Sequence, residues 1–142
     1  MSYWNCPPFY FKTMEKLFTQ RKEFDTAFKI KSRDLLGNIP ATSYMLEYCL
    51  IKEELEEYKE ACEQNDVIEI VDAIADMLYL VIGTATHHGI GHHTLQKVMD
   101  EVHRSNMSKL HDGEVVKDEN GKVAKPSTFS KPDLKGVLGS HI

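Results

Sequence analysis

Two neighbouring stretches decide the fold of this chain of 142 residues: LIKEELEEYKEAC, at residues 50–62, and VIEIVDAIADMLYLVI, at residues 67–82. The first is rich in Leu, Glu and Lys and contains neither Gly nor Pro, which favours a helix. Between them, Gln64-Asn65-Asp66 interrupts the pattern, and Asp66 is a good N-cap for the helix that follows. We therefore predict one helix over about residues 43–62 and a second over about residues 66–87.

Two more helices are predicted, one on each side of this pair. Apolar residues recur at mostly helical spacings over residues 8–30, and residues 31–42 carry the Gly and Pro of a connection. Gly89 and Gly91 end the helix predicted over residues 66–87, and helical periodicity returns over residues 95–109. The expected fold class is all-α, with a four-helix-bundle-like core.

The C-terminal region has a different character. Asp112-Gly113 and Asn120-Gly121 are turn dipeptides, and valines flank the second of them, so we expect a small hairpin. Residues 126–142 are expected to form an extended tail with one short helical turn near Pro132. Because the length fits one domain of about 100 to 200 residues, we predict a single domain over residues 1–142. Its helical core covers about residues 9–110, and its hairpin and tail cover residues 111–142.

The composition narrows the class of protein. Apolar residues make up 42% of the chain and charged residues 27%, which is ordinary for a globular protein. The 22 acidic residues outnumber the 17 basic ones, and the formal net charge of -5 disfavours a nucleic-acid polymer as partner. Three cysteines are too few for a disulfide framework, no secretory signal is visible, and the longest apolar stretch is far shorter than the roughly 20 residues that span a membrane. We expect a cytoplasmic protein with no membrane partner.

Some carboxylates of the first helix lie on its apolar side. On a helical wheel at about 100° per residue, Glu54 falls between two apolar positions, and Glu57 lies close by. Glu47, one heptad before Glu54, belongs to the same stripe. Glu53 turns toward the polar face, where surface charge is the simpler explanation.

The second helix carries its acids on one stripe as well. Nearly every residue of this stretch is apolar, so we expect the helix to be buried on most of its circumference. Its charged residues are Glu69, Asp72 and Asp76, which stand at i, i+3 and i+7. Buried ionised carboxylates need cations, hydrogen-bond donors or protonation. Helix capping together with Asp66 is an alternative explanation for Glu69 alone.

Two acidic stripes that face a bundle interior predict a site of about four to six carboxylates. All-oxygen ligation favours Mg²⁺ or Mn²⁺ over zinc, which prefers His and Cys. Proteins usually hold Mg²⁺ with a few carboxylates together with the phosphates of a substrate. The pattern therefore points to a phosphate-bearing substrate.

These residues also match a known signature. EELEE at residues 53–57, followed by EIVD at residues 69–72, resembles the EExxE and ExxD signature of the all-α nucleoside triphosphate pyrophosphohydrolases, the MazG-like superfamily. That superfamily includes dimeric dUTPases and phosphoribosyl-ATP pyrophosphohydrolase. The likeness continues through ADMLY at residues 75–79, and residues 102–110 resemble the downstream element of small MazG-like proteins. It implies Mg²⁺-dependent hydrolysis of a (deoxy)nucleoside triphosphate to the monophosphate and pyrophosphate.

The resemblance implies metal ligands from both helices: Glu54, Glu57, Glu69 and Asp72. Only 11 residues separate Glu57 from Glu69, and under an alternative alignment Asp76 takes the place of Asp72. Glu53 is a candidate for orienting water from the outer shell, so the expected catalytic carboxylates are Glu53, Glu54 and Glu57. In this reaction Mg²⁺ lowers the pKa of the water that attacks the α-phosphorus, and a free carboxylate accepts its proton.

Three residues near the end of the helix predicted over residues 95–109 are expected to contact the triphosphate: Arg104, Asn106 and Lys109. Cationic forks and amides suit phosphate oxygens, although capping of the helix C-terminus is the simpler alternative. Four histidines over residues 87–93 are a second candidate group, for a transition metal. Adjacent histidines more often mark a polar helix end.

Two other functions stay open at this point. A di-iron carboxylate bundle requires Glu-x-x-His on two helices, and the chain offers one comparable pair, Asp100 and His103. A non-enzymatic helical module, whose acidic stripe meets a basic partner, is the other alternative. The apolar area expected in so small a chain also favours self-association as a homodimer or homotetramer, as in the superfamily.

Overall fold

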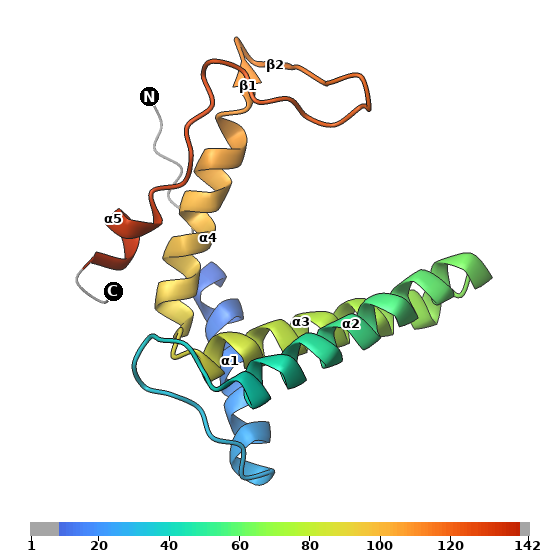
Figure 1. The fold of residues 1–142 in the computed structure, drawn as a ribbon, viewed down its shortest axis with the longest axis vertical. Coiled ribbons are helices and arrows are strands. Elements are labelled where there is room, and N and C mark those ends of the chain that lie inside the picture. Colours follow the sequence, from blue (N-terminus) through green and yellow to red (C-terminus); the bar gives the residue numbers. More distant parts are fainter. Residues whose placement is uncertain (1–8, 140–142) are drawn as a thin grey trace. The chain divides into compact units, whose positions relative to one another are not determined.

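The computed structural model describes residues 9–139, with side chains from residue 13 onward. The predicted all-α class is confirmed, and a minimal two-stranded hairpin accompanies the helices (Figure 1). In chain order the elements are α1 (Phe9–Ala27), α2 (Ala41–Gln64), α3 (Val67–His87), α4 (His92–Met107), β1 (Leu110–His111), β2 (Glu114–Val115) and α5 (Leu134–Leu138). The prolines that precede the N-terminal predicted helix, Pro7 and Pro8, lie outside the described residues.

The chain divides into two compact units, Met1–His92 and His93–Ile142. The first contains α1, α2 and α3, and the second contains α4, the hairpin and α5. Because α4 belongs to a different unit from α1, α2 and α3, the four-helix-bundle packing and the single-domain boundaries stay predictions.

A tight turn joins α2 to α3 as an antiparallel pair. Asn65 adopts a left-handed conformation with φ of 55°, and Asp66 caps α3 by accepting hydrogen bonds from the backbone N–H groups of Ile68 (3.1 Å) and Glu69 (3.2 Å). Ala61 of α2 and Ala73 of α3 are both buried, and such small side chains allow two helices to approach closely. The predicted N-cap is therefore confirmed.

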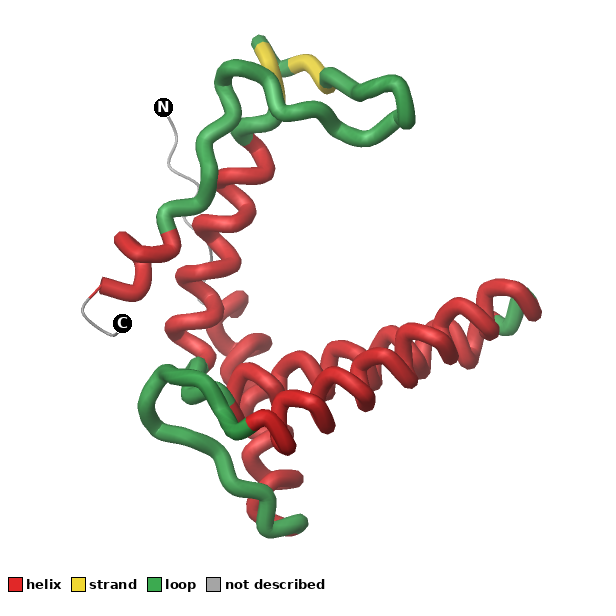
Figure 2. Tube along the Cα trace, in the orientation of Figure 1, coloured by secondary structure: helices red, strands yellow, loops and turns green. Residues whose placement is uncertain are grey.

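Helix α1 packs against α3 near the end of the pair where α2 begins and α3 ends (Figure 2). Phe24 of α1 stacks on Phe28, with ring centroids 4.3 Å apart, and meets the edge of Tyr79 from α3 at 5.7 Å. Phe18 is buried on the same helix. The aromatic contacts of α1 thus fall on the C-terminal half of α3 and leave its N-terminal half to α2.

The connection between α1 and α2 runs against the end of α3. The backbone N–H of Gly37 donates to the carbonyl of His88 (3.0 Å), and Nδ1 of His88 hydrogen-bonds the carbonyl of Gly37 (2.9 Å). Gly89 has φ of +77°, and a Cβ at this position would lie 2.2 Å from the carbonyl oxygen of Leu35. Only glycine fits this close approach, and its left-handed conformation lies two residues after His87, where α3 ends.

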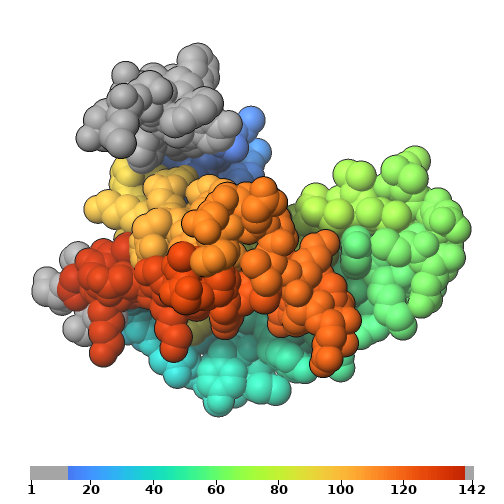
Figure 3. Space-filling model, turned by 90° about the horizontal axis from the view of Figure 1, so that it is seen from above, coloured from blue at the N-terminus to red at the C-terminus, as the bar shows by residue number. Residues whose placement is uncertain are grey.

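The prediction that the helix over residues 66–87, now α3, is buried on most of its circumference is wrong for the single chain. Ile68 is 78% exposed and Val71 is 62% exposed. Around the α2–α3 turn, in green in Figure 3, both helices lie at the surface. The reason is that α1 covers α3 only near its C-terminus. Further large apolar side chains are exposed on both helices: Tyr44, Met45, Leu46, Tyr48, Leu55, Val67, Ile74, Leu78 and Val81.

In the second unit, both predicted turn dipeptides form turns. Strands β1 and β2 pair across Asp112-Gly113, whose positive φ angles of 50° and 80° suit a tight hairpin turn. The ladder therefore flanks the first dipeptide, while Asn120-Gly121 is closed by a single bridge between Lys117 and Val123. The short helical turn expected near Pro132 is α5, which Asp133 caps. Among the described residues, no helix is long and apolar enough to cross a membrane.

Candidate functional site

Carboxylates of α2 and α3 lie near enough to influence one another electrostatically. The pKa of Glu54 is raised above its ordinary value, first because the carboxyl is partly desolvated and then because Glu57, Asp76, Glu53 and Asp72 act on it. Two of these groups lie on the helix of Glu54 and two lie on α3. The structure thus brings both predicted acidic stripes into one electrostatic neighbourhood, which we call the acidic cluster: Glu53, Glu54, Glu57, Asp72 and Asp76.

Glu54 is the member of the acidic cluster with the least solvent contact. It is half-buried, whereas Glu53, Glu57, Asp72 and Asp76 are exposed. Its Oε2 atom is buried and has no hydrogen-bond partner among the described residues. A buried acceptor without a donor is unfavourable, so this oxygen lacks a positive group or a donor that would compensate it.

Glu69 stands apart from the acidic cluster. It lies in the first turn of α3, where its backbone N–H donates to Asp66, and it is not among the groups that raise the pKa of Glu54. Its position agrees with the capping alternative, although a carboxylate in this turn lies one turn before Asp72. Its predicted role as a metal ligand stays a prediction.

The donor set of the acidic cluster suits a hard divalent cation. All its side-chain donors are carboxylate oxygens, which Mg²⁺ and Mn²⁺ prefer. None of these carboxylates forms an ion pair with Lys, Arg or His within the part of the chain that the structure describes. In that same part, no three His, Cys, Asp or Glu side chains are already gathered tightly enough to enclose a metal ion. The chemistry fits Mg²⁺, but the carboxylates would have to converge on it.

The predicted phosphate ligands belong to the second unit and are engaged there. Arg104 forms a two-pronged ion pair with Glu101, at 2.7 Å and 2.8 Å, and also donates to the carbonyl of Lys131 (3.1 Å). The hydrogen bonds from Arg104 and from the backbone N–H of Asp133 lower the pKa of Glu101 to about 2. Nζ of Lys109 donates to Oδ1 of Asn106 (2.7 Å). These contacts tie the C-terminal segment to α4, and the phosphate-binding roles stay predictions.

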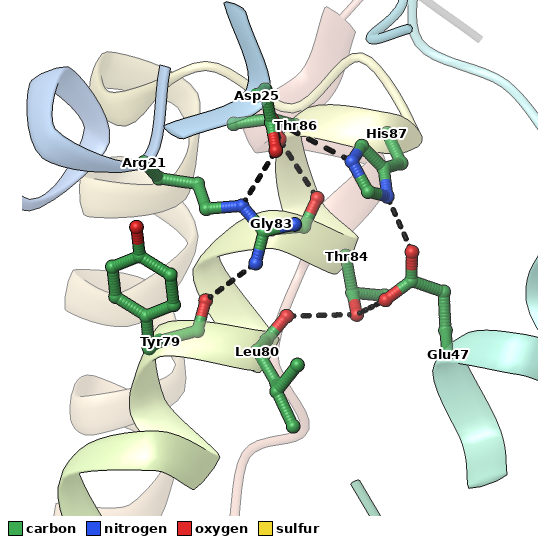
Figure 4. Close-up of polar contacts among 9 residues, drawn as sticks. All are labelled: Arg21, Asp25, Glu47, Tyr79, Leu80, Gly83, Thr84, Thr86 and His87. Atoms are coloured by element: carbon green, nitrogen blue, oxygen red, sulfur yellow. Dashed lines mark hydrogen bonds and ion pairs between the residues drawn. The ribbon is translucent and has the colours of Figure 1, made fainter. Parts of the chain in front are cut away.

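A buried polar network joins α1, α2 and α3, and it was not predicted from the sequence (Figure 4). Nε of Arg21 pairs with Oδ1 of Asp25 at 2.9 Å, and its Nη1 donates to the carbonyl of Tyr79 (3.2 Å). Both members of this pair are at most 5% exposed. The guanidinium also lies over the rings of Phe24 and Tyr79, 5.3 Å from each centroid.

Glu47 belongs to this network and not to the acidic cluster. The prediction that it continues the acidic stripe of Glu54 is therefore corrected. Its Oε2 accepts a hydrogen bond from Oγ1 of Thr84 (2.8 Å), and its Oε1 hydrogen-bonds Nδ1 of His87. The other ring nitrogen of His87 lies 3.5 Å from Oδ2 of Asp25. The i, i+4 spacing of Arg21 and Asp25 was the only sequence signal of this network, because its contacts between helices join residues 37 or more positions apart.

Residues 11–106 match the family model described as phosphoribosyl-ATP pyrophosphohydrolase. The match covers well over half of the chain and includes the whole acidic cluster, the buried polar network, Arg104 and Asn106. No curated protein matches the chain.

Gly83 makes room for the Arg21 guanidinium, and this predicts the sign of a substitution. In Gly83→Ala the new Cβ would lie 2.1 Å from Nη1 of Arg21, so the guanidinium must leave Asp25. Alanine gains about 1 kcal/mol in helix propensity, but breaking a buried ion pair costs about 3 to 5 kcal/mol. We expect a net loss of at least about 2 kcal/mol in the free energy of unfolding, measured by urea denaturation.

Gly91→Ala is the matched control, because a Cβ there meets nothing within 4 Å. Its effect should stay within about 0.5 kcal/mol. A Gly83→Ala protein as stable as the wild type would show that Arg21 does not occupy this position.

Proposed function

The chain belongs to the phosphoribosyl-ATP pyrophosphohydrolase family, whose members are nucleotide pyrophosphohydrolases, and from this premise we propose its reaction. It hydrolyses a (deoxy)nucleoside triphosphate between the α- and β-phosphorus atoms, with Mg²⁺ or Mn²⁺, and releases the nucleoside monophosphate and pyrophosphate. The observation that carries this proposal is the acidic cluster, with its orphaned Glu54 oxygen, on the two helices that the family match covers.

The residues of the acidic cluster have distinct tasks in this reaction. Glu57, Asp72 and Asp76, together with Glu54 and Glu69, are the oxygen donors that would hold the divalent cation. When bound, Mg²⁺ neutralises charge on the phosphate oxygens and lowers the pKa of a water ligand. A carboxylate of the cluster that does not ligate the cation accepts the proton of the attacking water. Glu53, which is exposed beside Glu54, orients that water.

A second substrate deserves the same test because the family model is named for it. Phosphoribosyl-ATP carries the same triphosphate, and its hydrolysis at the same bond also releases pyrophosphate. The acidic cluster acts on the triphosphate and does not distinguish the two substrates. Arg104, Asn106 and Lys109 remain the proposed phosphate contacts, and Arg104 would then exchange Glu101 for a phosphate oxygen.

We expect Mg²⁺-dependent release of pyrophosphate and a monophosphate from at least one compound in a panel of NTPs, dNTPs and phosphoribosyl-ATP. Glu54→Gln and Asp72→Asn should each lower kcat at least about 100-fold, since even the partners of metal ligands contribute about 10- to 100-fold. Their far-UV circular dichroism should stay helical. Glu56→Gln, an exposed acid of α2 outside the acidic cluster, is the matched control and should keep wild-type activity. Release of orthophosphate, or no turnover of any compound, would contradict the proposal.

The raised pKa of Glu54 also predicts how stability depends on pH without metal. In the folded state the carboxyl holds its proton more tightly than in the unfolded state, where its ordinary pKa is 4.5. Ionised Glu54 therefore destabilises the fold, and this effect grows as the pH rises from 4.5 through the raised pKa. In EDTA at pH 7, Glu54→Gln should raise the urea midpoint, whereas below the ordinary pKa the two proteins should converge. A glutamine variant that is less stable at pH 7 would contradict this.

We also propose that the exposed apolar side chains of α2 and α3 contact a second copy of the chain. Large apolar side chains exposed in this number on two neighbouring helices favour association. The protein should sediment as a dimer or larger at micromolar concentration, and Ile68→Glu should dissociate it. Leu35→Glu, at an equally exposed position in the α1–α2 connection, should not. A wild-type protein that sediments as a monomer would refute self-association.

A further inference from the structure

The buried polar network contains groups for which the proposed chemistry has no use. Glu47, Thr84 and His87 meet where α2 begins and α3 ends, and Glu47 is only 7% exposed. Both oxygens of the Glu47 carboxylate are engaged by α3, one by the hydroxyl of Thr84 and one by the ring of His87. We call these three residues the register pin, because they fix one residue of α2 against one turn of α3.

The register pin and the acidic cluster lie on the same alignment of the two helices. Glu47 precedes Glu54 by seven residues on α2, and Thr84 follows Asp76 by eight residues on α3. At a rise of about 1.5 Å per residue, these offsets correspond to about 11 Å and 12 Å along two antiparallel helices. A contact between Glu47 and Thr84 therefore places Glu54 beside Asp76, and these two carboxyls do act on one another.

Within the acidic cluster itself, the interactions push the helices apart. The carboxylates carry the same charge, and none of them has a cationic partner in the described residues. The α2–α3 turn fixes the alignment at one end of the pair, through Asn65 and Asp66. The register pin provides polar contacts at the other end, so the repelling groups lie between two fixed points.

Helix α1 supports the register pin from behind. Asp25 faces His87 at 3.5 Å while it holds Arg21, and Arg21 donates to the carbonyl of Tyr79, three residues after Asp76. The Thr84 hydroxyl also lies 3.0 Å from the carbonyl oxygen of Leu80 on its own helix, so its one proton is shared between this oxygen and Glu47. The residues that grip Glu47 are thus held on α3 at a fixed rotation.

We propose that Glu47, Thr84 and His87 are positioning residues that set the spacing between the α2 and α3 carboxylates and thereby the affinity for the divalent cation. This inference rests on the proposed function in one respect, namely that the acidic cluster binds Mg²⁺ or Mn²⁺. In this proposal the three residues are neither ligands of the metal nor contacts of the substrate.

The test is Mn²⁺ affinity, measured by isothermal titration calorimetry without nucleotide, well below the unfolding midpoint of each variant. Thr84→Val keeps the shape of the side chain and removes the hydroxyl that donates a hydrogen bond to Glu47. Glu47→Gln keeps the size of the side chain and removes its charge. Each should weaken Mn²⁺ binding about 10-fold, the effect typical of residues that orient metal ligands. Both changes affect the contact between Glu47 and Thr84, so the double variant should lose less than the sum of the two single effects. Glu56→Gln should bind Mn²⁺ like the wild type.

Turnover supplies a second readout with a distinct signature. High Mn²⁺ should restore kcat in Thr84→Val and Glu47→Gln but not in Asp72→Asn, because only the last lacks a proposed ligand. Unchanged Mn²⁺ affinity in both pin variants, whether or not their unfolding midpoints fall, would overturn the positioning role. A wild-type protein that binds Mn²⁺ but hydrolyses no nucleotide would refute the proposed function and leave the positioning role to be judged by affinity. A wild-type protein that binds no Mn²⁺ would refute both.

Discussion

The confinement of like charges between α2 and α3 is the constraint on which the rest of the structure depends. Glu54 is half-buried beside four other carboxyls, and its raised pKa records the unfavourable free energy of that arrangement. Two helices would relieve this repulsion by sliding or separating. The tight turn at Asn65 and Asp66 opposes this at one end, and the contacts of Glu47 with Thr84 and His87 oppose it at the other.

This constraint gives α1 its place in the fold. Arg21 enters the space left by Gly83 and compensates Asp25, which in turn faces His87. The buried carboxylate of Asp25 thus has a cationic partner in Arg21, whereas no carboxylate of the acidic cluster has one among the described residues. We interpret this contrast as a difference in role. The buried polar network fixes the helices, and the acidic cluster is available to a cation. Uncompensated charge at a functional site is a common reason for lower stability there.

Local patterns predicted much of the helical framework. Asp66 identifies the start of α3 because a capping carboxylate needs only its own neighbours, and Gly89 identifies its end for a similar reason. The electrostatic influence of Asp72 and Asp76 on Glu54 was also predictable, since the helical period places each acid on a face and a short turn joins the two helices. Which carboxylates bind metal and which move protons stays a prediction.

Contacts between distant residues were not predictable in this way. Periodicity assigned Glu47 to the acidic stripe, but its partners Thr84 and His87 lie 37 and 40 residues further along the chain. Periodicity likewise shows that α3 is apolar without showing what covers it, so the exposure of Ile68 was missed. The ion pair that engages Arg104 involves Glu101 only three residues away, but its second contact, with Lys131, comes from the tail.

The most direct test of this account is a crystal structure of the protein soaked in Mn²⁺, with data collected at the manganese absorption edge. We expect an anomalous peak between α2 and α3, within ligating distance of Glu54 and of Asp72 or Asp76. A peak confined to other carboxylates, or to the histidines at residues 87–93, would contradict the claim that the acidic cluster is the metal site.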